Sequence, residues 1–339
     1  MMPEHGGGLN AAVQRWGIPS EQWLDLSTGL NPLSWPVPPI PEQVWYRLPE
    51  ADDGLNAIIR DNTHLPAAAG CEAIAGSQAA IMALPRLRKP CRVGIPAIGY
   101  REHEYHWRAA GHQIICIAPQ LTDPAVVSDE AWLDELDVLV WINPNNPSGV
   151  LIPPATLLRW HRRLQRRGGW LLVDEAFMDA TPQFSLCPEA GLPGLIILRS
   201  LGKFYGLAGL RAGAVLGDAA VIESLRYLLG PWALSGPARY LMAQALQDQQ
   251  WQAQTRVRLQ RDSQRLQGLL EAAGLRVLGG TLLFQTVGLD APDVLAERLA
   301  AQGILVRRFE QPGMLRFGLA ADQQQWQRLE MALLAQRSD

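Results

Sequence analysis

In the stretch Arg199-Ser-Leu-Gly-Lys203-Phe-Tyr-Gly-Leu-Ala-Gly-Leu-Arg211-Ala-Gly213, a single lysine lies among glycine, serine and arginine, just after the apolar run Gly194–Leu198. A hydroxyl stands three residues before Lys203 and a guanidinium eight residues after it. Burial beside a cation would lower the pKa of such an amine and make it a nucleophile. A lysine that follows a strand is more often a solvated surface charge. The nucleophile interpretation therefore needs partners elsewhere in the chain.

Composition limits the classes of protein that this chain can represent. It has 339 residues, 48% hydrophobic and 19% charged, which predicts a globular protein with one large domain and a smaller one. The net charge of −3 with mixed signs argues against a nucleic-acid or membrane-surface role. The four cysteines include no CxxC pair, and we see neither a signal-peptide pattern nor an apolar run of membrane-spanning length. We expect a soluble cytoplasmic protein with reduced thiols.

Short apolar runs alternate with helical segments through the middle of the chain, as in Asp137–Ile142, 153–167 and Trp170–Val173. Buried parallel strands have this pattern because helices cover both faces of the sheet. We therefore predict an α/β fold with a doubly wound, mostly parallel sheet in residues 46–230. Residues 1–45 form a proline-rich arm, and residues 231–339 a smaller α+β domain.

Three other site types were considered and rejected. Gly202-Lys203 lacks the upstream glycine and the following Ser or Thr of a phosphate-binding loop. The run His5-Gly-Gly-Gly8 resembles an esterase oxyanion loop, but the chain has no G-x-S-x-G nucleophile motif. His103 and His106, three residues apart on one helix, are interpreted as a polar surface rather than a metal site. We expect no bound metal.

Several strand ends in the large domain carry polar or aromatic residues, and ligands bind outside the carboxyl ends of such strands. Gly76-Ser77-Gln78 opens a helix and could bind phosphate, although a plain serine cap would look the same. Tyr100 could stack on a flat ligand or simply pack in the core. Asn146 lies in a turn that could equally be a connector. Asp174 follows a buried run, where an acid needs a positive partner.

Together these residues suit a flat, aromatic, cationic ligand with a phosphate, namely pyridoxal 5'-phosphate. Asp174 would keep the ring nitrogen protonated, and Asn146 would bond the ring hydroxyl. Tyr100 would stack on the ring, and Lys203 would form an imine with the aldehyde. The phosphate would be bound by Gly76, Ser77, Ser200 and Arg211.

The order of these motifs resembles the fold-type I aminotransferase family over nearly the whole chain. Within it, the chain is most similar to the cobalamin-pathway threonine-phosphate decarboxylases. Three phrases carry that closer similarity: His5-Gly-Gly with Leu26-Ser27 and Asn31-Pro32, Arg199-Ser-Leu-x-Lys203-Phe-Tyr205, and Pro231-Trp232. The resemblance implies a seven-stranded large-domain sheet and a homodimer. It also implies decarboxylation of O-phospho-L-threonine to (R)-1-amino-2-propanol O-2-phosphate for the nucleotide loop of cobalamin.

The resemblance also implies roles for individual residues. Lys203 is similar to the lysine that binds the cofactor covalently, and Arg316 to the arginine that binds the substrate carboxylate. Arg307 resembles the position that meets the substrate phosphate. Without the resemblance, both arginines would be interpreted as exposed strand-edge residues. The other expected substrate contacts are His5, Gly6, Gly29 and Asn146.

Four positions depart from the family pattern. Phe177 replaces a tyrosine that usually reaches the ring hydroxyl, although we still expect it to line the cofactor site. Gly202 stands in place of a serine or threonine, and Gly29 in place of a substrate-contacting asparagine. Leu48 replaces the tyrosine through which a neighbouring subunit reaches the cofactor phosphate. These departures affect the expected substrate geometry more than the cofactor.

Three functions remain open from the sequence. A decarboxylase and a histidinol-phosphate-type aminotransferase would use the same residues, and they differ in which bond at the substrate Cα stands perpendicular to the ring. Only the arm and the family phrases favour decarboxylation. A catalytically silent, cofactor-sensing domain of a transcription regulator would need an added DNA-binding module, and the chain shows no basic helix-turn-helix.

Overall fold

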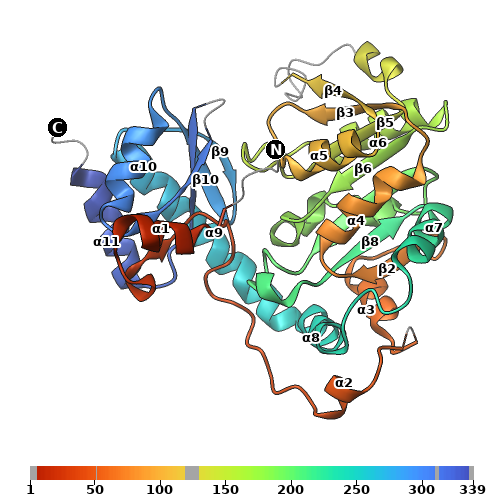
Figure 1. Cartoon of the computed structure of the whole chain (residues 1–339), viewed down its shortest axis with the longest axis horizontal. Coiled ribbons are helices and arrows are strands. Elements are labelled where there is room, and N and C mark those ends of the chain that lie inside the picture. The colour runs from red at the N-terminus through yellow and green to blue at the C-terminus, as the bar shows by residue number, and fades with distance from the viewer. Residues whose placement is uncertain (1–5, 51, 119–129, 310–312, 336–339) are drawn as a thin grey trace. The chain divides into compact units, whose positions relative to one another are not determined.

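The computed structural model describes residues 6–50, 52–118, 130–309 and 313–335 (Figure 1). The chain forms two compact units. The larger unit comprises residues 35–146 and 150–253, and the smaller unit residues 1–34, 147–149 and 254–339. The long helix α9 (Gln249–Ala272) contributes its first turn to the larger unit and its remainder to the smaller one.

The larger unit is built on a seven-stranded sheet with the strand order β2-β8-β7-β6-β5-β3-β4. β8 runs antiparallel to both of its neighbours, and every other pairing in the sheet is parallel. The strands are β2 (Gly70–Ile74), β3 (Arg92–Pro96), β4 (Gln113–Ile117), β5 (Val138–Ile142), β6 (Trp170–Asp174), β7 (Leu195–Ser200) and β8 (Gly213–Gly217). The doubly wound, mostly parallel sheet that the sequence predicts is therefore confirmed.

Helices cover this sheet because its strands are apolar on both faces; β5, for example, is buried at every residue. One face packs against α4, α5 and α7, which Figure 1 shows along one side of the sheet. On the other face, Trp141 of β5 contacts Trp160 of α6. The helices of this unit are α2 (Gln43–Tyr46), α3 (Leu55–Asn62), α4 (Ser77–Ala83), α5 (Glu102–Ala109), α6 (Pro154–Gln165), α7 (Ala219–Leu229) and α8 (Gly236–Gln247).

The smaller unit has an antiparallel four-stranded sheet of order β12-β13-β10-β9, together with a parallel pair formed by β1 and β11. That pair joins the N-terminal segment to the C-terminal part of the chain. Its strands are β1 (Leu24–Asp25), β9 (Arg276–Thr281), β10 (Phe284–Gly288), β11 (Ile304–Leu305), β12 (Arg307–Phe309) and β13 (Met314–Gly318). Its helices, besides most of α9, are α1 (Leu9–Trp16), α10 (Pro292–Ala300) and α11 (Gln323–Leu334).

Besides the two-residue β1, the sequence did not predict two strands, β8 and β9. Both are rich in glycine, which weakens the apolar pattern of a strand. The unit boundaries also lie away from the positions expected from the sequence: residues 231–253 belong to the larger unit, where α8 packs on α3.

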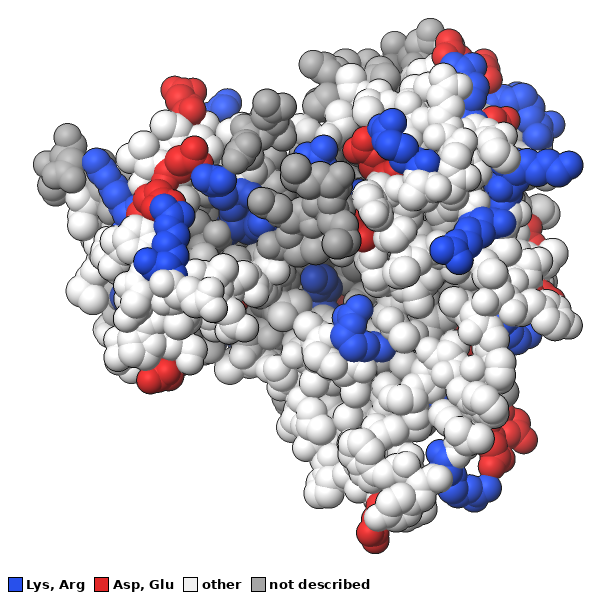
Figure 2. Space-filling view, in the orientation of Figure 1, with Lys and Arg blue, Asp and Glu red and all other residues white. Residues whose placement is uncertain are grey.

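Surface charge and hydropathy give no sign of a membrane-spanning segment in the described residues. Acidic and basic side chains are interspersed on the face drawn in Figure 2. In the described part of the chain, no helix is both long enough and apolar enough to span a membrane.

Candidate cofactor and substrate sites

Sheet topology brings the predicted cofactor residues to one edge of the larger unit. The carboxyl ends of β3, β5, β6 and β7 meet there because these strands are parallel. Since β8 is antiparallel, its first residue, Gly213, pairs with Ile74 of β2 and with Ser200 of β7. The strand ends, the loops and the first turn of α4 at this edge carry all the candidates of this unit: Gly76, Ser77, Gln78, Tyr100, Asn146, Asp174, Phe177, Ser200, Lys203 and Arg211.

Glycines form a close backbone cradle next to Arg211. A Cβ atom on Gly76 would lie 3.0 Å from Arg211 Nη2, and one on Gly213 would lie 3.0 Å from the Ser77 nitrogen. Gly76 has φ of 74°, and Arg211 itself is left-handed at φ 55° and ψ 48°. Such a conformation is costly for a residue other than glycine and is typical of functional sites. The exposed Arg211 guanidinium and the backbone of two glycines, Gly76 and Gly213, therefore lie together beside Ser77. This arrangement fits a phosphate.

The loop before the lysine is equally tight. The Gly202 N–H donates to Ser200 Oγ at 3.3 Å. A Cβ atom on Gly202 would lie only 3.2 Å from the Ala208 Cα. The close approach of these two backbone segments gives a physical reason for glycine at a position where the family pattern has serine or threonine.

Asp174 is buried at the end of β6, with 3% of its surface exposed. Its Oδ1 accepts the Ala176 N–H at 3.0 Å, and its Oδ2 lies 2.9 Å from His103 Nε2. Since a carboxylate only accepts, His103 Nε2 is the donor. A fully buried imidazole thus holds the orientation of the carboxylate that is expected to meet the ring nitrogen.

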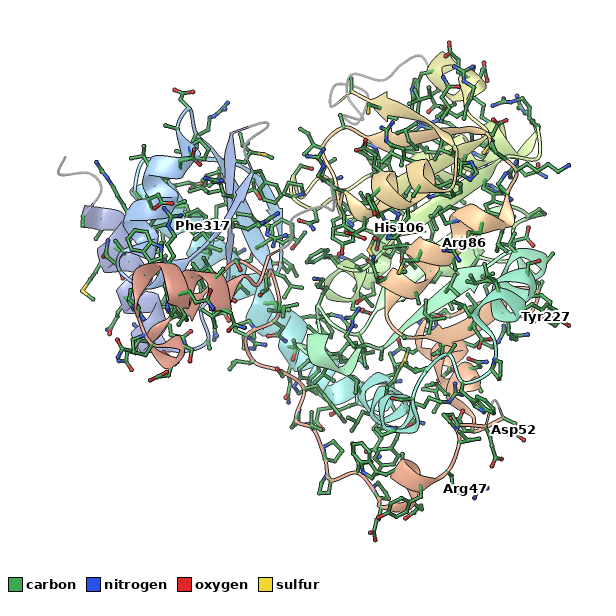
Figure 3. All side chains as sticks on the ribbon, in the orientation of Figure 1. Arg47, Asp52, Arg86, His106, Tyr227 and Phe317 are labelled. Carbon is green, nitrogen blue, oxygen red and sulfur yellow. The ribbon has the colours of Figure 1, made fainter. Side chains whose placement is uncertain are left out.

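A second set of hydrogen bonds connects Tyr100, which is expected to stack on the ring, with Gln78 of α4 and Glu102 of α5. Gln78 Nε2 donates to Glu102 Oε2 at 2.6 Å, and Tyr100 Oη donates to Gln78 Oε1 at 3.4 Å. His106, labelled in Figure 3, lies on the same helix with its Nε2 3.0 Å from Glu102 Oε2. Burial, and then the negative charges of Glu102 and Asp174, raise the pKa of Tyr100 to about 12. The phenol therefore stays protonated at neutral pH.

Lys203 follows β7, and its Nζ lies 5.4 Å from the centre of the Phe177 ring. Phe177 is buried, so one wall beside the amine is aromatic and apolar. Two hydrogen bonds from neighbouring asparagines fix the turn that carries Asn146. Asn143 Oδ1 accepts the Ile152 N–H at 2.8 Å, and Asn145 Nδ2 donates to the Ile98 oxygen at 3.0 Å. Asn146 itself is half-buried.

The smaller unit has its own cluster of predicted residues around Arg316. Arg316 and Arg307 are opposite partners on the antiparallel strands β13 and β12. Arg316 Nη2 donates to the Ser27 oxygen, and a Cβ atom on Gly29 would lie 3.5 Å from Arg316 Cζ. A Cβ atom on Gly6 would lie 2.7 Å from the same Ser27 oxygen. Ser27 thus brings Gly6 and Arg316 together, whereas His5 lies outside the described residues.

Arg316 is not an exposed strand-edge residue, because only 4% of its surface is accessible. Burial, and then the positive charge of Arg307, lower the pKa of its guanidinium to about 9, against an opposing effect of Asp25. Two like charges opposite one another on adjacent strands repel. An anionic ligand would relieve both the repulsion and the cost of burial.

Sequence reasoning missed His103. Its interpretation as part of a polar surface is wrong, because α5 turns His103 towards Asp174. One signal was available: Trp107, four residues later on the helix, is also fully buried, so both lie on one face. Pairing with Asp174, 71 residues away in the chain, could not be read from that spacing.

The chain is similar to known proteins of one family. Residues 65–336 match the family described as aminotransferase class I and II. The chain is 51% identical to a threonine-phosphate decarboxylase of Pseudomonas aeruginosa, over 98% of both chains. It is 40% identical to one of a Sinorhizobium species, over 97% of both. Similarity to a histidinol-phosphate aminotransferase of Yersinia pseudotuberculosis, at 38% identity, extends over only 38% of this chain and 32% of that protein.

Among solved structures, the chain resembles the histidinol-phosphate aminotransferase of Sinorhizobium meliloti, crystallised in complex with pyridoxal-5'-phosphate. The TM-score is 0.82 at 20% sequence identity, over 98% of this chain and 95% of the other. Likeness at this level of identity concerns the fold.

Proposed function

The chain belongs to the class I and II aminotransferase family, and from that premise we propose that it is a pyridoxal-phosphate-dependent decarboxylase of O-phospho-L-threonine. The product would be (R)-1-amino-2-propanol O-2-phosphate, for use in the nucleotide loop of cobalamin. One observation carries the choice: similarity to threonine-phosphate decarboxylases spans nearly the whole chain at up to 51% identity. Sequence similarity to the histidinol-phosphate aminotransferases of Yersinia pseudotuberculosis and Cronobacter sakazakii extends over less than half of it. Transamination is therefore the alternative.

The cofactor fits the edge of the larger unit. Arg211, Ser200 and the Gly76–Ser77 backbone would hold its phosphate, and Asp174 its ring nitrogen. Tyr100 and Asn146 would contact the ring, and Lys203 would hold the aldehyde covalently. When bound, pyridoxal phosphate supplies an electron sink for the pair left at the substrate Cα once a bond there breaks. The Lys203 amine would return a proton to that carbon.

The substrate carries two anionic groups, a carboxylate and a phosphate. We assign Arg316 to the carboxylate and Arg307 to the phosphate, because paired hydrogen bonds from a planar guanidinium suit both groups. Gly29 leaves backbone close to Arg316, and Gly6 leaves backbone close to the Ser27 oxygen that Arg316 bonds, without a side chain in the way. His5 and Asn146 complete the proposed substrate contacts.

Release of CO2 tests the proposal directly. Purified protein loaded with pyridoxal phosphate is incubated with O-phospho-L-threonine, and CO2 and the amine product are measured. O-Phospho-L-serine and histidinol phosphate, the latter with a keto acid acceptor, define the substrate range. Amino transfer without CO2 would overturn the decarboxylase assignment. A cofactor absorbance band that substrate does not change, in wild type as in Lys203→Ala, would indicate a silent sensing domain instead.

We also propose a cytoplasmic homodimer. All four cysteines are free, in keeping with a reducing compartment. The proline-rich connector exposes a run of large apolar side chains, Trp45, Tyr46 and Leu48, which a second copy of the chain would cover. Light scattering should give twice the chain mass of 37.3 kDa. Trp45→Arg should shift the protein towards the monomer, and a monomeric wild type would contradict the proposal.

A further inference from the structure

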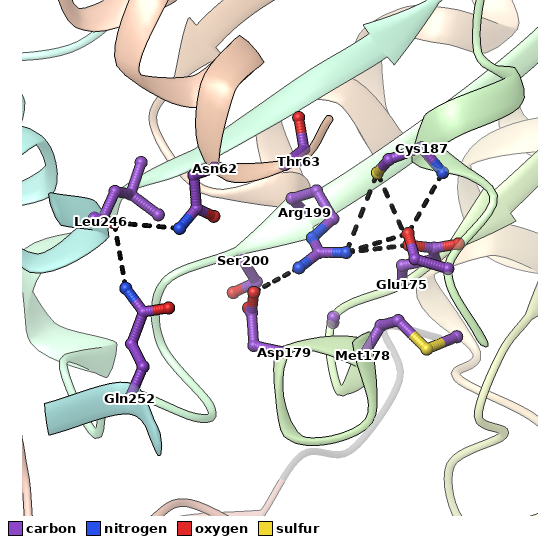
Figure 4. Close-up of polar contacts among 12 residues, drawn as sticks. Asn62, Thr63, Glu175, Met178, Asp179, Cys187, Arg199, Ser200, Leu246 and Gln252 are labelled. Atoms are coloured by element: carbon purple, nitrogen blue, oxygen red, sulfur yellow. Dashed lines mark hydrogen bonds and ion pairs between the residues drawn. The ribbon is translucent and has the colours of Figure 1, made fainter. Parts of the chain in front are cut away.

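A buried cluster of charged side chains lies directly behind the lysine loop of the larger unit (Figure 4). Arg199 Nη1 donates to Glu175 Oε2 at 2.9 Å, and Arg199 Nη2 donates to Asp179. Glu175 also accepts Ser185 Oγ–H at 2.6 Å and the Leu186 N–H at 2.7 Å. We call Arg199, Glu175 and Asp179 the Arg199 cluster.

Its charges are strongly coupled because they are out of water. Glu175 is fully buried, and burial raises the pKa of its carboxyl group even though Arg199 opposes the change. Burial alone would lower the pKa of Arg199, but the negative charge of Asp179, together with that of Glu175, raises it well above the ordinary value. One cation thus holds two carboxylates in place.

The position of the cluster in the chain links it to the cofactor residues. Glu175 directly follows Asp174, and Arg199 directly precedes Ser200. Phe177, which lies beside the Lys203 amine, falls between the two carboxylates that Arg199 binds. Main-chain pairing between β6 and β7 continues as far as the bond from the Glu175 N–H to the Leu198 oxygen, at 2.9 Å. Beyond that point the Arg199 side chain continues the connection between the two strands.

We propose that Arg199 is a positioning residue: by binding Glu175 and Asp179 together it holds the Asp174–Phe177 segment in register with Ser200 and Lys203. Replacing a buried ion cluster with apolar side chains is often neutral or favourable for stability. Added stability therefore does not explain why such a cluster is buried here, whereas the geometry that it fixes does. This proposal rests on the proposed use of pyridoxal phosphate.

A neighbouring arginine provides a matched control. Arg239 lies in the same unit and, like Arg199, is 8% exposed. It binds Asp53 through Nε and Nη2, both at 2.6 Å. Arg239 connects α8 to the start of α3 and is bonded to none of the cofactor-site residues in these contacts. Arg199→Met and Arg239→Met thus remove the same charge from two equally exposed arginines, although Asp53 is more exposed than Glu175 and Asp179.

The experiment measures cofactor binding and the colour of the bound cofactor as well as stability. Binding of pyridoxal phosphate to apo-protein is followed by tryptophan fluorescence, and the absorbance of the bound form is titrated with pH, well below both thermal midpoints. Both variants are expected to unfold at lower temperature. Only Arg199→Met should weaken cofactor binding, by about tenfold or more, because misplacement of binding groups by about 1 Å has effects of that size. It should also move the pH of the absorbance change, because Asp174, Phe177 and Ser200 would no longer be held in a fixed arrangement around the lysine link.

Arg199→Lys restores the positive charge but can reach only one of the two carboxylates directly. A cavity of about 20 Å³ beside Arg199 has room for one water that could bond the second carboxylate. We expect it to recover part of the affinity. If Arg199→Met does not fold, Arg199→Lys and Glu175→Gln are judged by the same two measurements. Equal cofactor affinity and equal pH titration in the Arg199 and Arg239 variants would overturn the proposal. A wild type that binds pyridoxal phosphate but releases no CO2 would refute the proposed function and leave this test valid.

Discussion

Replacing His103 with leucine should separate cofactor chemistry from stability. His103 Nε2–H donates to Asp174 Oδ2 at 2.9 Å, and neither residue has more than 3% of its surface exposed. A hydrogen bond to a charged group contributes about 1.5–3 kcal/mol, because its loss leaves the charge less well solvated. In a rate or binding constant this corresponds to about a 10- to 150-fold change. We expect the rate of CO2 release by His103→Leu to fall by this factor, since Asp174 would be a weaker partner for the ring nitrogen.

His161→Leu is the matched control. His161 is also buried in the larger unit, and its Nε2 lies 2.8 Å from the Pro193 oxygen. It lies on α6, which packs against the face of the sheet opposite to α5. Thermal unfolding should show a lower midpoint temperature in both variants than in wild type. Steady-state kinetics of CO2 release and the cofactor dissociation constant should change only in His103→Leu.

A conservative variant sharpens the interpretation. His103→Gln keeps an N–H donor at a similar reach, so it should recover part of the rate lost in His103→Leu. If both His103 variants release CO2 at the wild-type rate and bind the cofactor equally well, the His103–Asp174 pair has no part in catalysis and our reasoning fails. If leucine and glutamine are equally impaired, the imidazole acts through its shape rather than through its donor.

Three further variants test other parts of the structure. Arg316→Met should stabilise the ligand-free smaller unit by about 1 kcal/mol or more, because the buried guanidinium, whose pKa burial and Arg307 lower to about 9, is still charged at neutral pH. Hydrogen exchange in β13 measures this stability, and substrate turnover should be lost. Weaker protection from exchange in the variant would contradict the prediction. Gly149→Ala should lower the free energy of unfolding by about 3 kcal/mol and lower the thermal midpoint with it. Gly149 has φ of 75°, and a Cβ atom would lie 2.2 Å from the Gly280 nitrogen. An unchanged midpoint would show that the turn can shift. Tyr100→Phe should weaken cofactor binding through the lost contact with Gln78 but leave the shape of the pH–rate profile between pH 6 and about 10 unchanged, because the Tyr100 pKa is about 12.

The parts of the fold that sequence could predict are those that local pattern determines. Continuous apolar runs marked β5, β6 and β7, and the rule that ligands bind beyond the carboxyl ends of such strands located the candidate residues. β8 was missed because Gly213 and Gly217 flank only three apolar residues. Yet its antiparallel pairing is what places Arg211 next to Gly76, so one essential feature of the site depended on topology alone.

The charged pairs around the site could not be predicted for a related reason. His103 and Asp174 come from different elements, and so do Arg199 and Asp179, which are 20 residues apart. A sequence shows that an acid or a base follows a strand, but the identity of its partner depends on how helices pack on the sheet. Burial then determines whether the charge is an exposed surface group or a constraint on the site.

The departures from the family pattern have structural explanations that the residue types alone did not give. Gly29 has φ of 62°, a left-handed conformation that glycine adopts freely and that asparagine tolerates better than most other residues. Glycine here and asparagine in the decarboxylase pattern are thus alternatives for the same backbone. A Cβ atom at this position would lie 3.3 Å from the Phe284 ring and 3.5 Å from Arg316 Cζ, so any side chain there would point at the proposed carboxylate-binding group. Because this chain lacks one, the proposed anion-binding role in the smaller unit would fall more heavily on Arg316 and Arg307 themselves.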